Sequence, residues 1–175
     1  MNKRLFYALD IRDEDKLKID ILRQPFINNV RPVALDNFHI TLCFMGSISP
    51  SQSHALNREI QQLLQSLPKL NNAQRQLTSD SIGLFRKPQV LYLDFKQFPE
   101  NFRKIANALS QASVNLGIHQ ENRPYRPHLT IARKAKMLPT VSPFSITMQV
   151  NAFSLYESTS TKNGVSYIPI QSWKL

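Results

Sequence analysis

The sequence predicts an α+β fold in which two similar lobes face each other across a shared groove. The apolar pattern alternates between strand and helix periods with frequent hairpin signals, which favours α+β over a doubly wound parallel sheet. A motif of histidine, aliphatic residue, threonine and aliphatic residue occurs once in each half, at His39 and at His128, 89 residues apart (128 minus 39). No linker or low-complexity segment divides the chain, so we expect residues 1–175 to form a single domain.

The first half of the chain reads as two strands and two helices. In order, the pattern predicts a strand over 4–11, a helix over 13–23, a strand over 38–45 and a helix over 50–67. Apolar residues of the first helix are Leu17, Ile19, Ile21 and Leu22. Pro25 and Pro32 bracket a loop, and Gly46 is expected to end the second strand. Ser49-Pro50 opens the second helix because proline suits a first helical turn.

The second half reads as strands around one further helix. It predicts strand-like segments over 74–85 and 90–95, a helix over 99–116, and strands over 128–133, 144–156 and 165–173. The helix places Phe102, Ile105, Leu109 and Val114 on or near one stripe and ends at Gly117. Residues 86–89 suit a hairpin connection, and Asn163-Gly164 is a strong hairpin signal between the last two strands.

Composition indicates a basic protein that binds polyanions. Twenty-two Lys and Arg against twelve Asp and Glu give a formal charge of +10, which favours RNA, DNA or an anionic membrane surface as partner. The apolar run at the start is too short for a signal peptide, and no window approaches the roughly 20 apolar residues that span a bilayer. The single cysteine, Cys43, agrees with a reducing compartment. We therefore expect a soluble, cytoplasmic protein.

The two histidine motifs are the candidate chemical groups. On a strand, side chains i and i+2 share a face, so His39 and Thr41 point to one side, as do His128 and Thr130. The intervening apolar residues, and Phe44 with them, are expected on the opposite face. A single histidine of this kind is more often structural. Two copies in equivalent strands instead supply two imidazoles and two hydroxyls to one groove.

This set of groups suits the cleavage of a phosphodiester. With an ordinary pKa of about 6.5, one imidazole can act as general base on a water while the other, protonated, donates to the departing ribose oxygen. The threonine hydroxyls can donate hydrogen bonds to the non-bridging phosphoryl oxygens. The spacing does not distinguish which histidine is the acid.

The motifs also resemble those of a known family. FHITLCFMG and RPHLTIAR are similar to the paired H-x-T-x signatures of the 2H phosphoesterase superfamily, and in detail to the RNA 2′,3′-cyclic 3′-phosphodiesterases, also called 2′-5′ RNA ligases. RLFYALDI, RPVALDNFHITL, the Arg-Pro-x-x-Pro-His approach to the second motif, and a last strand ending in an aromatic residue and Leu extend the likeness over nearly the whole chain.

The resemblance implies a bilobal, pseudo-twofold fold with two antiparallel sheets and outer helices around a central cleft. It also implies metal-independent opening of a terminal 2′,3′-cyclic phosphate to leave a 2′-phosphate, reversible as 2′-5′ ligation. On this resemblance His39 is the proton donor, His128 is the proton acceptor, and Thr41 and Thr130 bind the phosphate.

Three further residues near the second motif are candidates for contact with the substrate, and two of them, Arg133 and Tyr125, have a second interpretation. Arg133 is similar to an arginine that family members carry here, but strict alternation puts it on the face opposite His128, so it reaches the phosphate only if the strand twists or bulges; otherwise it forms a surface ion pair. Tyr125 either stacks on a base or packs in the loop. Arg126 is a possible RNA contact beside it, within a basic group from 123 to 136 that flanks the site.

The remaining histidines, the cysteine and the absent motifs point to no other chemistry. The sequence has no H-x-x-x-H, C-x-x-C, P-loop or G-x-G-x-x-G motif, so we expect no metal and no nucleotide cofactor. Alternation would put Cys43 on the face of His39 and Thr41, yet a buried small hydrophobe is the better interpretation. His54 and His119 are expected to be solvated or capping residues.

The leading interpretation is a monomeric enzyme that hydrolyses cyclic phosphates on RNA ends, tRNA-like or oligoribonucleotide. The same chemistry on 2′-5′ linked oligonucleotides or on a small cyclic phosphate is the nearest alternative. A non-catalytic RNA-binding module that keeps the groove to hold a phosphate is the alternative from another class.

Overall fold

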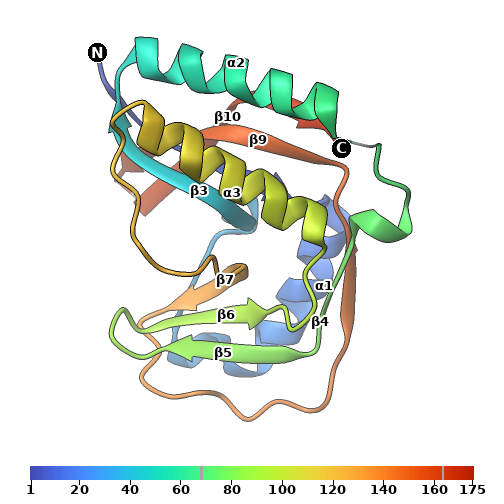
Figure 1. Cartoon of the computed structure of the whole chain (residues 1–175). Helices are drawn as coiled ribbons and strands as arrows, with labels where there is room; N and C mark the ends of the chain where they lie inside the picture. The colour runs from blue at the N-terminus through green and yellow to red at the C-terminus, as the bar shows by residue number, and fades with distance from the viewer. Residues whose placement is uncertain (68, 163) are drawn as a thin grey trace.

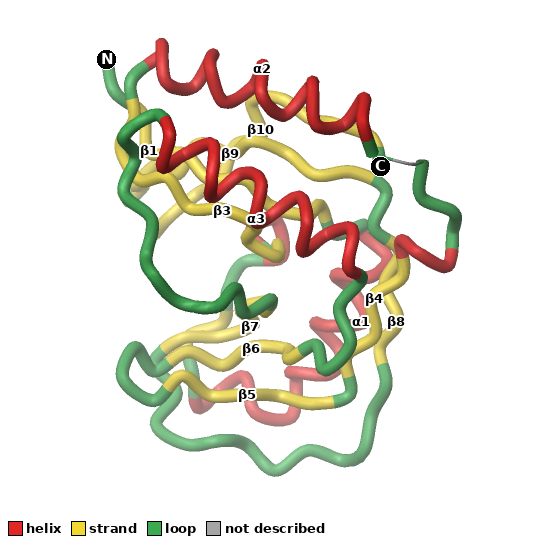
Figure 2. Tube along the Cα trace, viewed as in Figure 1, coloured by secondary structure: helices red, strands yellow, loops and turns green. Residues whose placement is uncertain are grey.

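The protein is an α+β structure of two lobes, seen one above the other in a computed structural model (Figure 1). The structure describes residues 1–67, 69–162 and 164–175. The upper lobe, lobe A, carries α2 (Pro50–Ser66) and α3 (Glu100–Asn115) side by side over its sheet. In the lower lobe, lobe B, α1 (Asp13–Arg23) lies behind the strands (Figure 2). The helices thus pack against the sheets, α3 on β3 (His39–Ile48) in lobe A and α1 on β8 (Ile146–Gln149).

The strands of both lobes are antiparallel. Lobe A orders them β10 (Gly164–Lys174), β9 (Ala152–Thr161), β1 (Lys3–Asp10) and β3 (His39–Ile48); lobe B continues with β7 (His128–Arg133), β6 (Val90–Asp94) and β5 (Ser81–Phe85), and β2 (Arg31–Pro32) pairs with β7. A separate pair joins β4 (Gln76–Ser79) to β8 (Ile146–Gln149). One backbone pair, Ile40 with Leu129, connects β3 to β7 and therefore lobe A to lobe B. This architecture confirms the predicted fold class.

The predicted internal repeat is visible in the strand pairing. The equivalent pairs are Asp10 with His39 and Ala8 with Thr41 in lobe A, and Asp94 with His128 and Tyr92 with Thr130 in lobe B. In both lobes the next residue of the motif strand, Leu42 or Ile131, is skipped by the partner strand. Each motif is therefore followed by a β-bulge at the same position.

The bulge reverses the alternation of side chains beyond it. Leu42 and Cys43 are both buried, and Phe44 is 46% exposed. The expectations that Cys43 shares a face with His39, and that Phe44 points away from it, were therefore wrong. The inserted residue is set by the register with β1, which the sequence of β3 alone does not reveal.

Several boundaries differ from the sequence prediction. β3 does not end at Gly46, which has φ +69 at a second bulge, but runs on to Ile48. Segment 74–85 divides into β4 and β5, and segment 144–156 divides into β8 and β9, because the chain leaves one sheet for another between them. The loop between Pro25 and Pro32 contains a 3-10 turn, Gln24–Asn29, and β2.

The helices bury narrower stripes than predicted. In α1, Ile19 is buried between Asp15 and Arg23, whereas Leu17 and Ile21 are 57% and 72% exposed. Val114 of α3 is also exposed, at 52%. The helix predicted over 13–23 is confirmed, with Ile19 as its buried apolar residue. The expectation that Val114 lies on or near the apolar stripe was wrong, because α3 rests one side on its sheet and turns the other to solvent. The predicted start of α2 is confirmed: Ser49 and Gln52 form a reciprocal capping box.

The last two strands form the predicted hairpin, with Thr161 opposite Gly164. Asn163, half of the hairpin signal, and Pro68 lie outside the described residues. Buried apolar side chains from both lobes form one cluster, which includes Tyr7 of β1, Leu93 of β6 and Phe102 of α3. None of the helices in the described ranges has the length and apolarity needed to cross a bilayer.

Gly83 permits the close packing of two strands under the second motif. A Cβ at Gly83 would lie 2.2 Å from Cζ of Tyr92, whose ring stacks on Phe85 at 4.1 Å between centroids. Gly83→Ala is therefore expected to lower the free energy of unfolding by about 1–3 kcal/mol, the usual cost of overpacking, measured by urea denaturation. The loss of unfolding free energy caused by Gly83→Ala should be smaller in a Tyr92→Ala background, because the clashing ring is gone. If the two substitutions lower the unfolding free energy additively, the clash between residue 83 and Tyr92 is contradicted.

Candidate active site

A cavity of about 600 Å³ lies between the lobes and contains both motifs. It brings together five of the predicted site residues, His39, Thr41, His128, Thr130 and Arg133. The remaining lining comes from lobe A: Arg4, Phe6, Phe44, Ser158, Ser160, Val165 and Tyr167. One shared pocket therefore holds an imidazole and a hydroxyl from each half of the chain.

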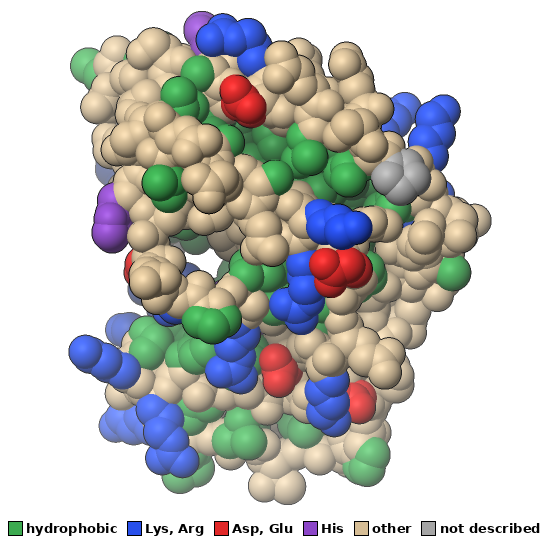
Figure 3. Space-filling model, viewed as in Figure 1, with side chains coloured by type: hydrophobic (Ala, Val, Ile, Leu, Met, Phe, Trp, Pro, Cys, Tyr) green, Lys and Arg blue, Asp and Glu red, His purple; other side chains and the backbone are tan. Residues whose placement is uncertain are grey.

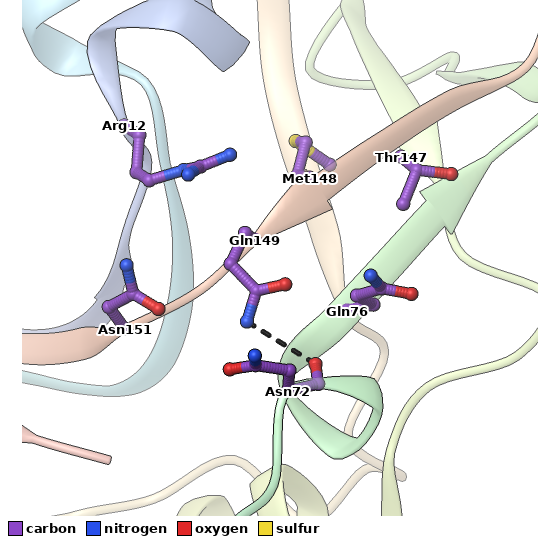
Figure 4. A pocket seen from close by; sticks show the side chains of 7 residues that line it. All are labelled: Arg12, Asn72, Gln76, Thr147, Met148, Gln149 and Asn151. Carbon is purple, nitrogen blue, oxygen red and sulfur yellow. Dashed lines mark hydrogen bonds between the residues drawn. The ribbon is translucent and has the colours of Figure 1, made fainter.

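A second cavity, of about 430 Å³, holds none of the predicted site residues. Figure 4 shows its polar lining, namely Arg12, Asn72, Gln76, Thr147, Met148, Gln149 and Asn151. The guanidinium of Arg12 is occupied by Glu14 and by buried Asp15, and the Gln149 amide donates to the carbonyl of Asn72 at 3.3 Å. It contains neither histidine motif, so the cavity between the lobes is the candidate active site.

Each imidazole is fixed by a hydrogen bond to the backbone two residues before it. Nδ1–H of His39 donates to the carbonyl of Asn37 at 2.7 Å, and Nδ1–H of His128 donates to the carbonyl of Arg126 at 2.9 Å. In the neutral ring this bond places the hydrogen on Nδ1 and leaves the lone pair on Nε2. The Nε2 atom of His39 lies 3.1 Å from the hydroxyl of Thr41.

Aromatic rings enclose both histidines. His39 has Phe6 at 4.9 Å and Tyr167, edge-on, at 5.0 Å between centroids. His128 has Phe85 at 5.1 Å and Tyr92 at 5.7 Å, both edge-on. These contacts restrict ring rotation and remove water from the imidazoles, which disfavours their charged forms.

The pKa values of both histidines are lowered. Burial lowers the pKa of His39 to about 4, against the hydrogen bond to Asn37 that favours the proton, with further repulsion from His128 and Arg133. Burial also lowers the pKa of His128, with repulsion from Arg126 and Arg123 adding to it. At neutral pH both rings of the free protein are therefore uncharged, and either Nε2 can accept a proton.

Arg133 reaches the pocket because of the bulge at Ile131. Ile131 and Ala132 are both buried, so the next side chain is returned to the face of His128 and Thr130. For Arg133 to reach the pocket, the sequence required a twist or bulge in the strand, and the bulge is present. Phe44 occupies the equivalent place in lobe A, where the guanidinium of Arg4 lies 5.0 Å from its ring centroid. Sequence reasoning missed Phe44, since strict alternation buries it.

Tyr125 and Arg126 do not line the pocket. The hydroxyl of Tyr125 donates to the carbonyl of Thr41 at 2.9 Å, and its ring packs 5.9 Å from that of Phe98. This supports the loop-packing interpretation of Tyr125. Arg126 donates to the hydroxyl of Tyr92 at 2.6 Å and lies 4.0 Å from the carboxylate of Asp94.

Cys43 lies in the core and not in the pocket. Its Sγ is 3.6 Å from the hydroxyl of Ser113 on α3, and it is 4% exposed. Burial raises the pKa of the thiol to about 11, so a reactive thiolate is disfavoured. Within the described ranges, no three side chains of His, Cys, Asp or Glu gather in an arrangement that could share a metal ion.

A bilobal α+β fold with one histidine and one threonine from each lobe in a common pocket defines the two-histidine class of phosphoesterases. Residues 16–161 match the model of the 2′-5′ RNA ligase superfamily, and the chain belongs to that family.

Relatives span the chain from end to end. It is 32% identical to the RNA 2′,3′-cyclic phosphodiesterase of Escherichia coli, over 99% of this chain and 97% of the relative, and 24% identical to that of Archaeoglobus fulgidus, over 94% and 96%. Among solved structures, E. coli LigT complexed with 3′-AMP superposes with a TM-score of 0.88 at 31% identity, covering 100% of this chain and 99% of that one.

The position of Arg133 can be tested through the titration of His39. Arg133→Gln should raise the pKa of His39 above its value of about 4, because a repelling charge is removed while burial is unchanged. Imidazole nitrogen NMR across an acid titration measures the midpoint. Lys136→Gln, an equal charge change outside the pocket lining, is the control. An identical His39 midpoint in wild type and Arg133→Gln would place the guanidinium away from the ring.

Proposed function

We propose that this protein hydrolyses the 2′,3′-cyclic phosphate at the end of an RNA and leaves a 2′-phosphate. The observation that carries the proposal is the pair of backbone-anchored imidazoles in one pocket with Arg133. The activity named for the E. coli and A. fulgidus relatives is the same, and the relatives cover nearly the whole chain.

The proposed step adds one water across one P–O bond. Nε2 of His128 takes a proton from the attacking water, and the water oxygen bonds to phosphorus. The bond from phosphorus to the ribose O3′ breaks, and the protonated Nε2 of His39 supplies the proton that O3′ needs. The phosphate stays on O2′, and solvent restores the two imidazoles. Family resemblance assigns the donor and acceptor, and the roles exchange when the reaction runs backward as 2′-5′ ligation.

The lowered pKa of His39 suits this scheme only when phosphate is bound. In the free protein, burial, His128 and Arg133 keep His39 neutral. A phosphate anion between the rings offsets those positive charges and favours the proton on His39. The Thr41 hydroxyl, already 3.1 Å from Nε2, and the Thr130 hydroxyl are placed to donate to phosphoryl oxygens, and Arg133 offsets their charge.

The rest of the pocket fits a nucleoside. The exposed ring of Phe44, beside Arg4, offers an aromatic surface on which a base can stack. The substrate in this proposal is the end of an oligoribonucleotide or tRNA-like RNA. The two lobes act as a single domain, since one buried cluster spans both. We also propose that the protein is a monomer in the cytoplasm. Its only cysteine is a buried free thiol, which agrees with a reducing compartment.

Loss of either imidazole should remove most of the activity. His39→Ala and His128→Ala should each lower kcat by about 10²- to 10⁴-fold, because each removes one acid or base group. The assay follows an oligoribonucleotide ending in a cyclic phosphate, with and without EDTA, and identifies which hydroxyl keeps the phosphoryl group. EDTA should have no effect, and the product should be the 2′-phosphate.

His54→Ala is the matched control, since His54 lies on α2 and outside the pocket lining. Full activity in either pocket variant, or activity lost to the chelator, would refute the two-imidazole scheme. Tight RNA binding without turnover of any cyclic phosphate would favour a binding module instead.

The pH dependence should differ between kcat/KM and kcat. The free protein reacts only while one imidazole carries a proton, and both pKa values lie below the usual 6.5, that of His39 at about 4. The reactive form therefore declines as pH rises, and kcat/KM should fall between pH 6 and 8. The profile of kcat should lie at higher pH, because bound phosphate raises both pKa values. A kcat/KM that increases over this range would contradict the lowered pKa values.

A further inference from the structure

Basic residues near the pocket lie in two places, the loop before β7 and one end of lobe B, and these differ in whether acidic side chains offset their charge. In the loop that leads from α3 to β7, Arg123 forms an ion pair with Glu121 at 2.6 Å. Arg126 on the same loop is engaged by Tyr92 and Asp94. The positive charges of this loop, which the sequence grouped with the basic residues up to 136, are thus offset by neighbouring acids.

The end of lobe B carries positive charges that lack such partners among the described residues. Arg133 at the pocket pairs along the backbone with Arg31 of β2 on one side and with Val90 of β6 on the other. Beyond it, Ala135 donates to the carbonyl of Gln89 at 3.1 Å and so ties the segment after β7 to the β5–β6 turn. These connections bring six exposed cations to one end of lobe B, a group we call the basic end: Arg31, Arg86, Lys87, Arg133, Lys134 and Lys136.

The basic end is free to bind an anion. None of its six side chains forms an ion pair or a hydrogen bond with any residue in the described part of the chain. Figure 3 shows Lys and Arg side chains gathered at the lower left, where Figure 1 places the turn between β5 and β6. The group is continuous with the pocket, because Arg133 belongs to both.

We propose that the basic end binds the phosphate backbone of the RNA upstream of its cyclic terminus, so that the chain leaves the pocket over the β5–β6 turn of lobe B. This inference rests on the proposed function, since it takes the terminal phosphate to lie between the two histidines. The unpaired cations form a row that leads out of the pocket. The phosphates of an RNA strand, attached to the bound terminus, are a matching row of negative charges. The loop before β7 offers less unpaired positive charge to an RNA phosphate, because Arg123 and Arg126 already have acidic side chains beside them.

Removal of three charges from the basic end tests the inference. The variant Arg86→Gln/Lys87→Gln/Lys136→Gln leaves Arg133 and the pocket intact. The matched control is Arg58→Gln/Lys69→Gln/Lys104→Gln, which removes the same charge from exposed positions in or just after the helices of lobe A. None of these three side chains has an ion pair within residues 1–67, 69–162 and 164–175. Binding of an oligoribonucleotide is measured by fluorescence anisotropy over a range of salt concentrations. Turnover of a 2′,3′-cyclic mononucleotide is measured alongside.

The basic-end variant should lose affinity for the oligoribonucleotide by at least about tenfold near 0.1 M salt. The slope of log affinity against log salt should become shallower by about 2, at roughly 0.7 for each of three lost single-strand phosphate contacts. The control should keep both values, and the cyclic mononucleotide should be turned over equally by all three proteins, since it is too short to reach the basic end.

Equal loss in both triple variants would overturn the inference, because it would trace binding to net charge alone. Unchanged RNA binding in the basic-end variant would also overturn it, as would binding of anionic lipid vesicles through these residues with no effect on RNA. The proposed function fails by a different result, the absence of turnover on any cyclic phosphate. In that case the anisotropy comparison still decides whether the basic end binds the RNA backbone.

Discussion

The single backbone pair between Ile40 and Leu129 is the constraint on which the site depends. Each of these residues directly follows a motif histidine, so the pair that joins the lobes also sets the separation of the two imidazoles. Carbonyls two residues before each histidine then fix the ring orientation. The pocket that contains both motifs lies between the lobes that this pair joins. The chemistry of the molecule is therefore positioned mainly by backbone hydrogen bonds.

The positive charge in the pocket has opposite effects on anion binding and on the protonation of His39. Arg133 favours an anionic ligand, yet the same charge, together with burial, opposes a proton on His39. In the free protein these effects combine the positive charge of Arg133 with neutral imidazoles in one pocket. In the proposed scheme a bound phosphate would change the balance for both groups at once, because its negative charge attracts Arg133 and favours the protonated form of His39. Ligand binding and the protonation of His39 are thus linked in this scheme.

Much of the fold and site could be predicted from the sequence. The period-2 rule was sufficient to put His39 with Thr41, and His128 with Thr130, on one face, and the repeat was sufficient to infer two lobes. The alternation failed just beyond each motif, because a bulge depends on the register of the neighbouring strand and leaves no mark in the bulged segment. Cys43 and Phe44 were misplaced for this reason, and Arg133 was left open. Val114 was misplaced, and the exposure of Leu17 and Ile21 was not foreseen, because apolar spacing does not say which side of a helix meets a sheet.

The paired bulges have a consequence for selectivity between the two ribose oxygens. A pocket with true twofold symmetry would offer the same protein groups on both sides of a bound phosphate, so that only the asymmetry of the ribose itself could distinguish O2′ from O3′. The scaffold here is nearly symmetric through both histidines and both threonines. At the first side chain returned to the pocket after each bulge, it places a phenyl ring in one half and a guanidinium in the other. Any contribution of the protein to regioselectivity has to come from residues that break the symmetry, and these two lie nearest to the motifs along the chain.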